Sequence, residues 1–184
     1  MLDKALIMHC SPTLAGLKSA NIVNYTFTDM DTLYDQLAQC RKMLNPKGVS
    51  IRLIKTTDTK ALIYVYRRDR VQNDLRKDNV LNFLSDHGYE TDQVDHCIER
   101  LISRMSVQTD FPHEIGLFLS YPLDDVKGFI ENKGQNCRCV GCWKVYCNEC
   151  EARKTFARFD KCKNVYCDLF CRGPRNLQQL TVAA

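Results

Sequence analysis

The chain has 184 residues, of which 45% are hydrophobic and 26% are charged, and its net charge at pH 7 is +4. This composition is typical of a water-soluble globular protein, and no apolar run reaches the roughly 18 residues that a membrane span needs, so an integral membrane protein is excluded. Basic residues alternate with acidic ones instead of forming a stripe, which argues against a dedicated nucleic-acid-binding protein. The length suits one hydrophobic core, and we predict a single domain covering residues 1–184.

The first residues do not resemble an export signal, because the apolar stretch is short, carries Asp3 and lacks a small-residue cleavage site. We therefore expect a cytoplasmic protein in a reducing compartment. The eleven cysteines are then free thiols or metal ligands rather than members of a disulfide framework.

Two helices are predicted before the first strand. The first begins at Ser11 and Pro12, since serine is a good N-cap and proline suits the first helical turn. This start places Cys10 beside the positive end of the helix dipole. The second covers residues 31–44, where four apolar side chains recur at helical spacing and an Asn-Pro pair provides the stop.

The middle of the chain predicts a hairpin followed by helices. Two apolar, β-branched runs over residues 50–55 and 61–66 are separated by a polar turn, which indicates an antiparallel pair. Apolar spacing, with Asp78 as a start signal and Gly88 as a stop signal, then predicts three helices over residues 67–77, 78–88 and 91–105.

The remaining elements predict a parallel unit. Residues 114–120 form a continuous apolar run and indicate a buried strand, and a helix follows from Pro122 with the acidic pair Asp124-Asp125 complementing its dipole. A strand over residues 140–146 completes a βαβ unit with a right-handed crossover, and a long helix follows it. The predicted fold class is α+β (mixed α/β), with the hairpin and the βαβ unit forming a small sheet flanked by about six to seven helices.

Several segments of the chain share the pattern of one protein family. The longest is PHEIGLFLSYPLDDVKGFIENKG at residues 112–134, and the others are residues 9–18, 64–67, 143–146 and 180–183. On these residues the chain resembles a bacterial family known as domain of unknown function 3793, over nearly its whole length. The resemblance implies a cytoplasmic bacterial protein and implies no specific activity. The cysteines near residues 137–150 are more numerous than in the family pattern.

The first candidate site pairs Cys10 with His113. A thiol at a helix N-terminus has its thiolate stabilised by the dipole, and an imidazole from elsewhere in the fold can deprotonate it. Glu114, Asp110 or a polar residue near Trp143 would orient the imidazole ring, and periodicity does not choose among them. These residues predict a cysteine-dependent enzyme whose substrate is undefined. The alternative is that Cys10 is a small buried residue and His113 a side chain at a strand edge.

The second candidate is a metal site in the cysteine-rich strand-helix segment 137–171. Two Cys-x-x-Cys pairs have a spacing that suits zinc or an iron–sulfur cluster, and further thiols are close in sequence. The paired ligands are Cys139, Cys142, Cys147 and Cys150, and the additional ones are Cys137, Cys167 and Cys171. The alternative is a set of scattered free thiols, because a strand between the pairs would hold them more than about 10 Å apart.

The third candidate is an anion site at the predicted start of the first helix. Free backbone N–H groups at a helix N-terminus attract phosphate or carboxylate, and Ser11, Thr13 and Lys18 would complete such a site. These residues predict a non-catalytic module that binds a small molecule or a protein partner. The alternative is that Ser11 only caps the helix.

Overall fold

The computed structural model describes residues 1–90, 93–107, 111–173 and 175–183. These residues form two compact units, which are described separately. Unit 1 consists of residues 1–68 and 161–184, and unit 2 consists of residues 69–160. The long C-terminal helix begins in unit 2 and ends in unit 1. The single domain that the length suggests stays a prediction.

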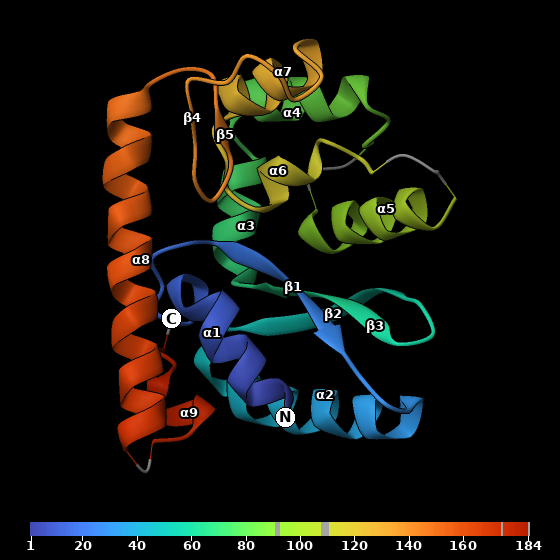
Figure 1. Cartoon of the computed structure of the whole chain (residues 1–184). Helices are drawn as coiled ribbons and strands as arrows, with labels where there is room; N and C mark the ends of the chain where they lie inside the picture. The colour runs from blue at the N-terminus through green and yellow to red at the C-terminus, as the bar shows by residue number, and fades with distance from the viewer. Residues whose placement is uncertain (91–92, 108–110, 174, 184) are drawn as a thin grey trace. The chain divides into compact units, whose positions relative to one another are not determined.

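Unit 1 is built around a three-stranded antiparallel sheet (Figure 1). Its elements are α1 (Leu2–Leu14), β1 (Ala20–Thr26), α2 (Met30–Leu44), the 3-10 helix η1 (Asn45–Lys47), β2 (Ser50–Thr56), β3 (Lys60–Tyr66), the second half of α8 (Glu149–Arg172) and α9 (Leu177–Leu180). The strand order is β1-β3-β2, so Val23 lies opposite Ile63 and Ile51 lies opposite Val65. The predicted hairpin is confirmed as β2 and β3, whereas β1 is an additional strand that the sequence analysis missed.

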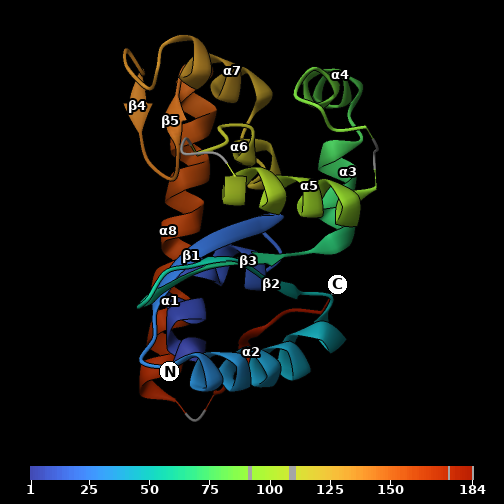
Figure 2. The same cartoon turned by 90° about the vertical axis from the view of Figure 1, so that its right-hand side faces the viewer.

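The core of unit 1 lies on one face of this sheet. Alternate β3 residues Ala61, Ile63 and Val65 pack there against α1, α2 and α9, and Figure 2 shows α1 and α2 on the same side of the sheet. The stripe predicted on the second helix is confirmed, because all of its members are buried: Leu33, Leu37, Cys40 and Leu44.

The first helix differs from its prediction. It begins at Leu2 rather than at Ser11, so Ser11 and Pro12 lie in its last turn. A proline there costs one backbone hydrogen bond, to the carbonyl of Met8. Burial of four residues at i, i+4 spacing outweighs that cost: Leu2, Leu6, Cys10 and Leu14.

Unit 2 consists of helices and one small hairpin. Its elements are α3 (Arg68–Leu75), α4 (Asp78–Asp86), α5 (Val94–Val107), α6 (Ile115–Phe118), α7 (Leu123–Glu131), β4 (Cys139–Val140), β5 (Lys144–Val145) and the first half of α8. The helices predicted after the hairpin and after Pro122 are confirmed, although the proposed start at Thr91 lies outside the described residues. Gly88 takes a positive φ value of 80°, as its role as a stop signal requires, and Gly134 after α7 takes one of 74°.

The predicted βαβ unit is wrong. The run expected to be a strand at residues 114–120 contains the short helix α6, and the expected strand at 140–146 is an antiparallel hairpin that turns at Gly141. A continuous apolar run is equally compatible with a buried strand and a buried helix, so periodicity alone could not separate them. The α+β class itself is confirmed. In the ranges described, no helix has the length and apolarity to cross a lipid bilayer.

Candidate functional site

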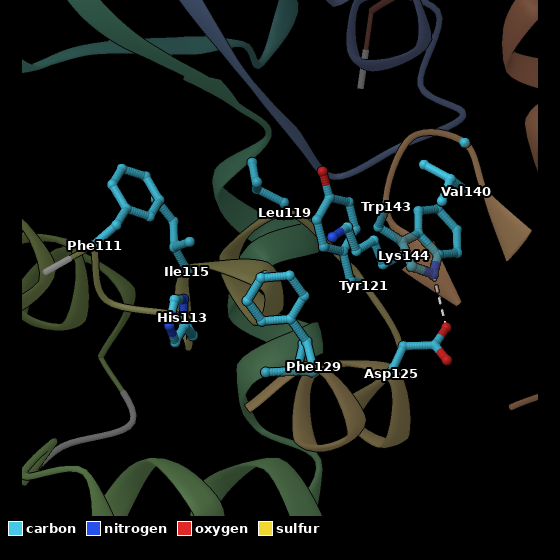
Figure 3. Close-up of a pocket in the computed structure, with 13 residues that line it drawn as sticks. Phe111, His113, Ile115, Leu119, Tyr121, Asp125, Phe129, Val140, Trp143 and Lys144 are labelled. Carbon is cyan, nitrogen blue, oxygen red and sulfur yellow. Dashed lines mark hydrogen bonds between the residues drawn. The ribbon is translucent and has the colours of Figure 1, made fainter. Parts of the chain in front are cut away.

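Unit 2 contains a pocket with a volume of about 360 Å³ (Figure 3). Its lining comes from the segment before α6, from α6 and α7, and from the β4–β5 hairpin. Pockets of this size commonly hold a small organic ligand. The lining residues are Phe111, His113, Ile115, Gly116, Leu119, Tyr121, Asp125, Val126, Phe129, Val140, Gly141, Trp143 and Lys144.

Aromatic rings form much of the pocket wall. Tyr121 stacks on Trp143 with ring centroids 5.0 Å apart and an interplanar angle of 28°. Trp143 also meets the ring of Phe156 edge-on, with ring centroids 4.6 Å apart. His113 packs edge-on against Phe129 at 5.0 Å, and Figure 3 shows Phe129 between His113 and the group formed by Tyr121 and Trp143. These pairs have the stacked and edge-on geometries that aromatic side chains prefer.

A buried carboxylate holds the hairpin side of the wall. Asp125 is 3% exposed, and its Oδ2 accepts a hydrogen bond of 2.7 Å from Trp143 Nε1, as Figure 3 shows. Its Oδ1 accepts from the backbone N–H groups of Tyr146 at 2.8 Å and Cys147 at 3.0 Å. Several donors therefore stabilise the charge of this carboxylate, and in return they fix the hairpin and the indole ring against α7.

Tyr121 supplies a second link between the pocket wall and the hairpin. Its hydroxyl donates to the carbonyl of Cys142 at 3.0 Å. Burial raises the pKa of Tyr121 to about 12, so the phenol keeps the proton that this hydrogen bond needs at neutral pH. The tip of the hairpin is thus held by a ring contact and a hydrogen bond from the same side chain.

Two glycines allow the close packing around the pocket. A Cβ atom on Gly128 would lie 2.6 Å from the Cβ of Tyr146, and one on Gly116 would lie 2.7 Å from Cγ2 of Val126. Both distances are too short for carbon atoms, so α7 can approach the hairpin and α6 only because these residues have no side chain.

The structure places the predicted nucleophile inside a closed core. Cys10 lies within α1 rather than at its start, and it has no exposed surface. Burial raises the pKa of its thiol from 9.0 to about 12, although the positive charge of Lys18 opposes this shift. A thiol that stays protonated and buried is a poor nucleophile, so the geometry favours the alternative of a packing residue.

The predicted partners of Cys10 have other neighbours. His113 belongs to unit 2, where it lines the pocket beside Phe129. Glu114 is 2% exposed, and its Oε1 accepts from the Tyr89 hydroxyl at 3.1 Å and lies 3.0 Å from Nε of Arg104. Burial and the Glu114 charge raise the pKa of Tyr89, which keeps its hydroxyl protonated as a donor. Glu114 therefore serves a buried polar cluster rather than orienting His113, and the other named candidate, Asp110, lies outside the described residues.

The predicted anion site loses its structural basis. Ser11 and Thr13 lie in the last turn of α1, where the helix dipole is negative and repels anions. The Ser11 hydroxyl donates to the carbonyl of Ile7, and the Thr13 hydroxyl donates to Oδ1 of Asn21 at 2.7 Å. Lys18 follows the helix and is 5% exposed. The capping that was the alternative is also wrong, because Ser11 does not begin a helix.

The cysteines of segment 137–171 are not gathered into one ligand set. All eleven cysteines of the chain are free thiols. In the part of the chain that the structure describes, no group of three or more histidine, cysteine or acidic side chains is placed to hold a metal ion. Four of the candidate ligands are partly buried, namely Cys137, Cys139, Cys147 and Cys167, and three are exposed, namely Cys142, Cys150 and Cys171.

Cys147 contacts a buried carboxylate. Its thiol lies 3.4 Å from Oδ1 of Asp125, to which it donates, and burial with this carboxylate raises the pKa of the thiol to about 11. The zinc or iron–sulfur prediction therefore has no support from the arrangement of the thiols. The residues that do converge, Asp125, Phe129 and Trp143, were missed as a site, because they come from two elements separated in the sequence, α7 and the β4–β5 hairpin.

Comparison with known proteins gives one match. The chain belongs to the family described as Protein of unknown function (DUF3793), whose model matches residues 6–181. This match confirms the family resemblance found in the sequence. No curated protein and no solved structure matches the chain.

Proposed function

We propose that this protein is a binding module that holds a small aromatic molecule in the pocket of unit 2, without a covalent step at Cys10. The observation that carries the proposal is a pocket of about 360 Å³ whose apolar wall includes the rings of Tyr121, Phe129 and Trp143 and is held in place by the buried carboxylate of Asp125. A wall fixed before the ligand arrives loses little conformational entropy on binding, which favours affinity.

The chemistry of the wall supports an aromatic ligand. Phe129 and Trp143 offer ring faces and edges, and Ile115 and Leu119 add aliphatic contacts. Aromatic pairs are stabilised by about 0.5–1.5 kcal/mol beyond the burial of their area. The Asp125 carboxylate already accepts from the hairpin and the indole, so it supports binding by shaping the wall rather than by proton transfer.

We also infer a cytoplasmic location. Eleven free thiols in one chain are what a reducing compartment permits, and this supports the location expected from the composition. In that location the ligand would be a cytoplasmic metabolite rather than an extracellular one.

The single tryptophan of the chain makes the proposal directly testable. Because Trp143 lines the pocket, its fluorescence reports ligand binding without a label. Titration with trans-cinnamide, a small planar aromatic amide, is expected to change the emission to saturation and to raise the melting temperature. Replacing Phe129→Leu keeps apolar volume but removes a ring, and it is expected to weaken binding by about tenfold.

A matched control tests whether the effect of Phe129→Leu on binding comes from the pocket or from the loss of any aromatic ring. Tyr34 on α2 is 52% exposed and belongs to unit 1, so Tyr34→Leu removes a ring without touching the pocket and is expected to leave binding unchanged. The proposal fails if a panel of small aromatics, trans-cinnamide included, changes neither the Trp143 emission nor the melting temperature.

A further inference from the structure

We propose that the aromatic ligand carries an anionic group, a carboxylate or a similar oxyanion, which Lys144 and His113 recognise at the pocket. This inference rests on the proposed function and deepens it by naming the chemical class of the ligand. The side chains of Lys144 and His113 both border the ring of Phe129 (Figure 3). The ring of the ligand would lie against this phenyl ring.

Lys144 is held at the pocket by two contacts. Its Nζ donates to the carbonyl of Gly134 at 2.6 Å and lies 5.7 Å from the centroid of the Phe129 ring. An ammonium group has three N–H donors, so this hydrogen bond leaves others for a ligand. The side chain is therefore oriented in advance while most of its donor capacity stays available.

The charge of Lys144 is not neutralised within the described residues. No carboxylate in those ranges forms an ion pair with it, whereas surface lysines such as Lys77 and Lys154 do have acidic partners at 2.8 Å and 2.7 Å. Asp125 also lines the pocket, but its carboxylate is buried and accepts hydrogen bonds from Trp143 and the hairpin backbone. A ligand anion thus meets at Lys144 an ammonium group with free N–H donors, whereas the Asp125 carboxylate is directed at the indole and the hairpin backbone.

His113 adds a second polar contact on the other side of Phe129. Its ring is exposed and packs edge-on against the phenyl ring, with centroids 5.0 Å apart. An imidazole N–H donates to an oxyanion in either protonation state. A planar ring that carries a carboxylate would satisfy the apolar wall with its ring and these two side chains with its oxygens.

Two probes of equal shape test the inference. trans-Cinnamate and trans-cinnamide share the same ring and chain and differ in charge. We expect wild-type protein to bind the carboxylate about tenfold tighter at low salt, the order of one charge-assisted hydrogen bond at a partly exposed site. The preference should shrink as salt is added, because exposed charges are screened.

Three lysine variants assign the preference to a side chain. Lys144→Gln keeps a donor for the Gly134 carbonyl but loses the charge, and it is expected to bind both probes equally. Lys144→Arg is expected to restore the preference. Lys127→Gln, on the exposed side of α7 and outside the pocket lining, is the matched control and should keep it. The melting temperature of each variant checks that it folds.

The outcomes are distinct. Equal binding of both probes by the wild type overturns this inference and leaves the proposed function standing. Binding of neither probe overturns both. A carboxylate preference that survives in Lys144→Gln overturns the role of Lys144, and the same titration with His113→Asn then tests whether the imidazole alone accounts for it.

Discussion

Arg67 in unit 1 and Asp125 in unit 2 are both 3% exposed, and each joins segments that are distant in sequence. Arg67 donates from Nε to the carbonyl of Thr13 at 2.7 Å, and from Nη2 to those of Leu14 at 2.8 Å and Val182 at 2.7 Å. Asp125 does the opposite and accepts from backbone N–H groups and an indole. Each buried charge is therefore compensated by several neutral groups.

Arg67 and Asp125, which we call the anchors of unit 1 and unit 2, differ in their surroundings. Arg67 donates to carbonyls at the end of α1, which have no hydrogen-bond donor within the helix. The hydrophobic core beside that helix is closed. Asp125 instead fixes a hairpin whose Trp143 stays partly exposed and lines a pocket. One anchor completes a packed core, and the other keeps a binding surface in shape. The following experiments test this difference between the two anchors.

Thiol labelling is expected to show the largest difference. Cys10 is fully buried, and the pKa of its thiol is raised to about 12, whereas Cys150 is exposed. A buried thiol reacts only when the protein opens, and unfolded fractions are on the order of one in a thousand or less. Near neutral pH, iodoacetamide should therefore label Cys150 at least about a thousandfold faster, as measured by peptide mass spectrometry over time.

Similar labelling rates for the two cysteines would contradict the closed core. They would also restore the enzyme hypothesis based on Cys10. The melting temperature of the partly labelled protein provides the control, because it shows whether modification of exposed thiols has itself opened the fold.

Removing the anchor of unit 1 is expected to cost the most stability. Arg67→Met removes the side-chain hydrogen bonds to the carbonyls of Thr13, Leu14 and Val182, and the free energy of unfolding should fall by about 3 kcal/mol. Backbone N–H groups still donate to the carbonyls of Thr13 and Leu14 in this variant. Arg67→Lys should recover part of this loss, because it keeps a charge but not the planar set of donors. Urea denaturation measures both, and Arg52→Met on the exposed side of β2 is the control.

Removing the charge of the second anchor should cost less but should affect the pocket. Asp125→Asn keeps one acceptor oxygen, so we expect a loss of about 2 kcal/mol together with a red shift of the Trp143 emission. Asp124→Asn changes the exposed neighbouring residue on the same turn, and it should alter neither the stability nor the Trp143 emission. A variant of Asp125 that loses stability while the indole emission stays unchanged would show that this carboxylate does not shape the pocket wall.

The contrast between the anchors also explains what the sequence could and could not predict. Local signals identified α2, the β2–β3 hairpin, α7 and α8, because apolar spacing and turn residues act within one element. The Ser11-Pro12 pair is a local signal too, but it was misleading, since burial of the stripe from Leu2 to Leu14 decides where α1 begins. Strand β1 was missed because Asn21 and Asn24 interrupt its pattern and it is completed only by pairing with β3.

The site could be predicted even less. Asp125 lies in the first turn of α7, where a dipole explains an acidic residue, and nothing local indicates that its carboxylate reaches Trp143 and the hairpin backbone. His113 was a candidate for a different reason, as a base, and the structure instead places it at a pocket. The one available signal was the single tryptophan, close to a glycine and two cysteines in a short turn.

The smallest expected effect tests the contact between α7 and the hairpin. Gly128→Ala should favour the helix by about 1 kcal/mol from propensity alone. The new Cβ would lie 2.6 Å from the Cβ of Tyr146, however, and overpacking of this kind costs about 1–3 kcal/mol. We therefore expect a net loss of about 1 kcal/mol in urea denaturation, with weaker trans-cinnamide binding, because Tyr146 adjoins the hairpin that forms the wall.

Lys127→Ala, one residue earlier on α7 and exposed, is the control. Lysine and alanine both favour a helix, so this variant should change the stability only slightly, through the loss of the contact between Lys127 and the Phe83 ring. If Gly128→Ala were as stable as this control and still bound the ligand, Tyr146 would have to yield without moving the pocket wall. The hairpin would then be positioned by the hydrogen bonds of Asp125 alone, and close packing would not contribute. If Gly128→Ala lowered the free energy of ligand binding more than the free energy of unfolding, the absence of a Cβ at this residue would be a requirement of the pocket rather than of the fold.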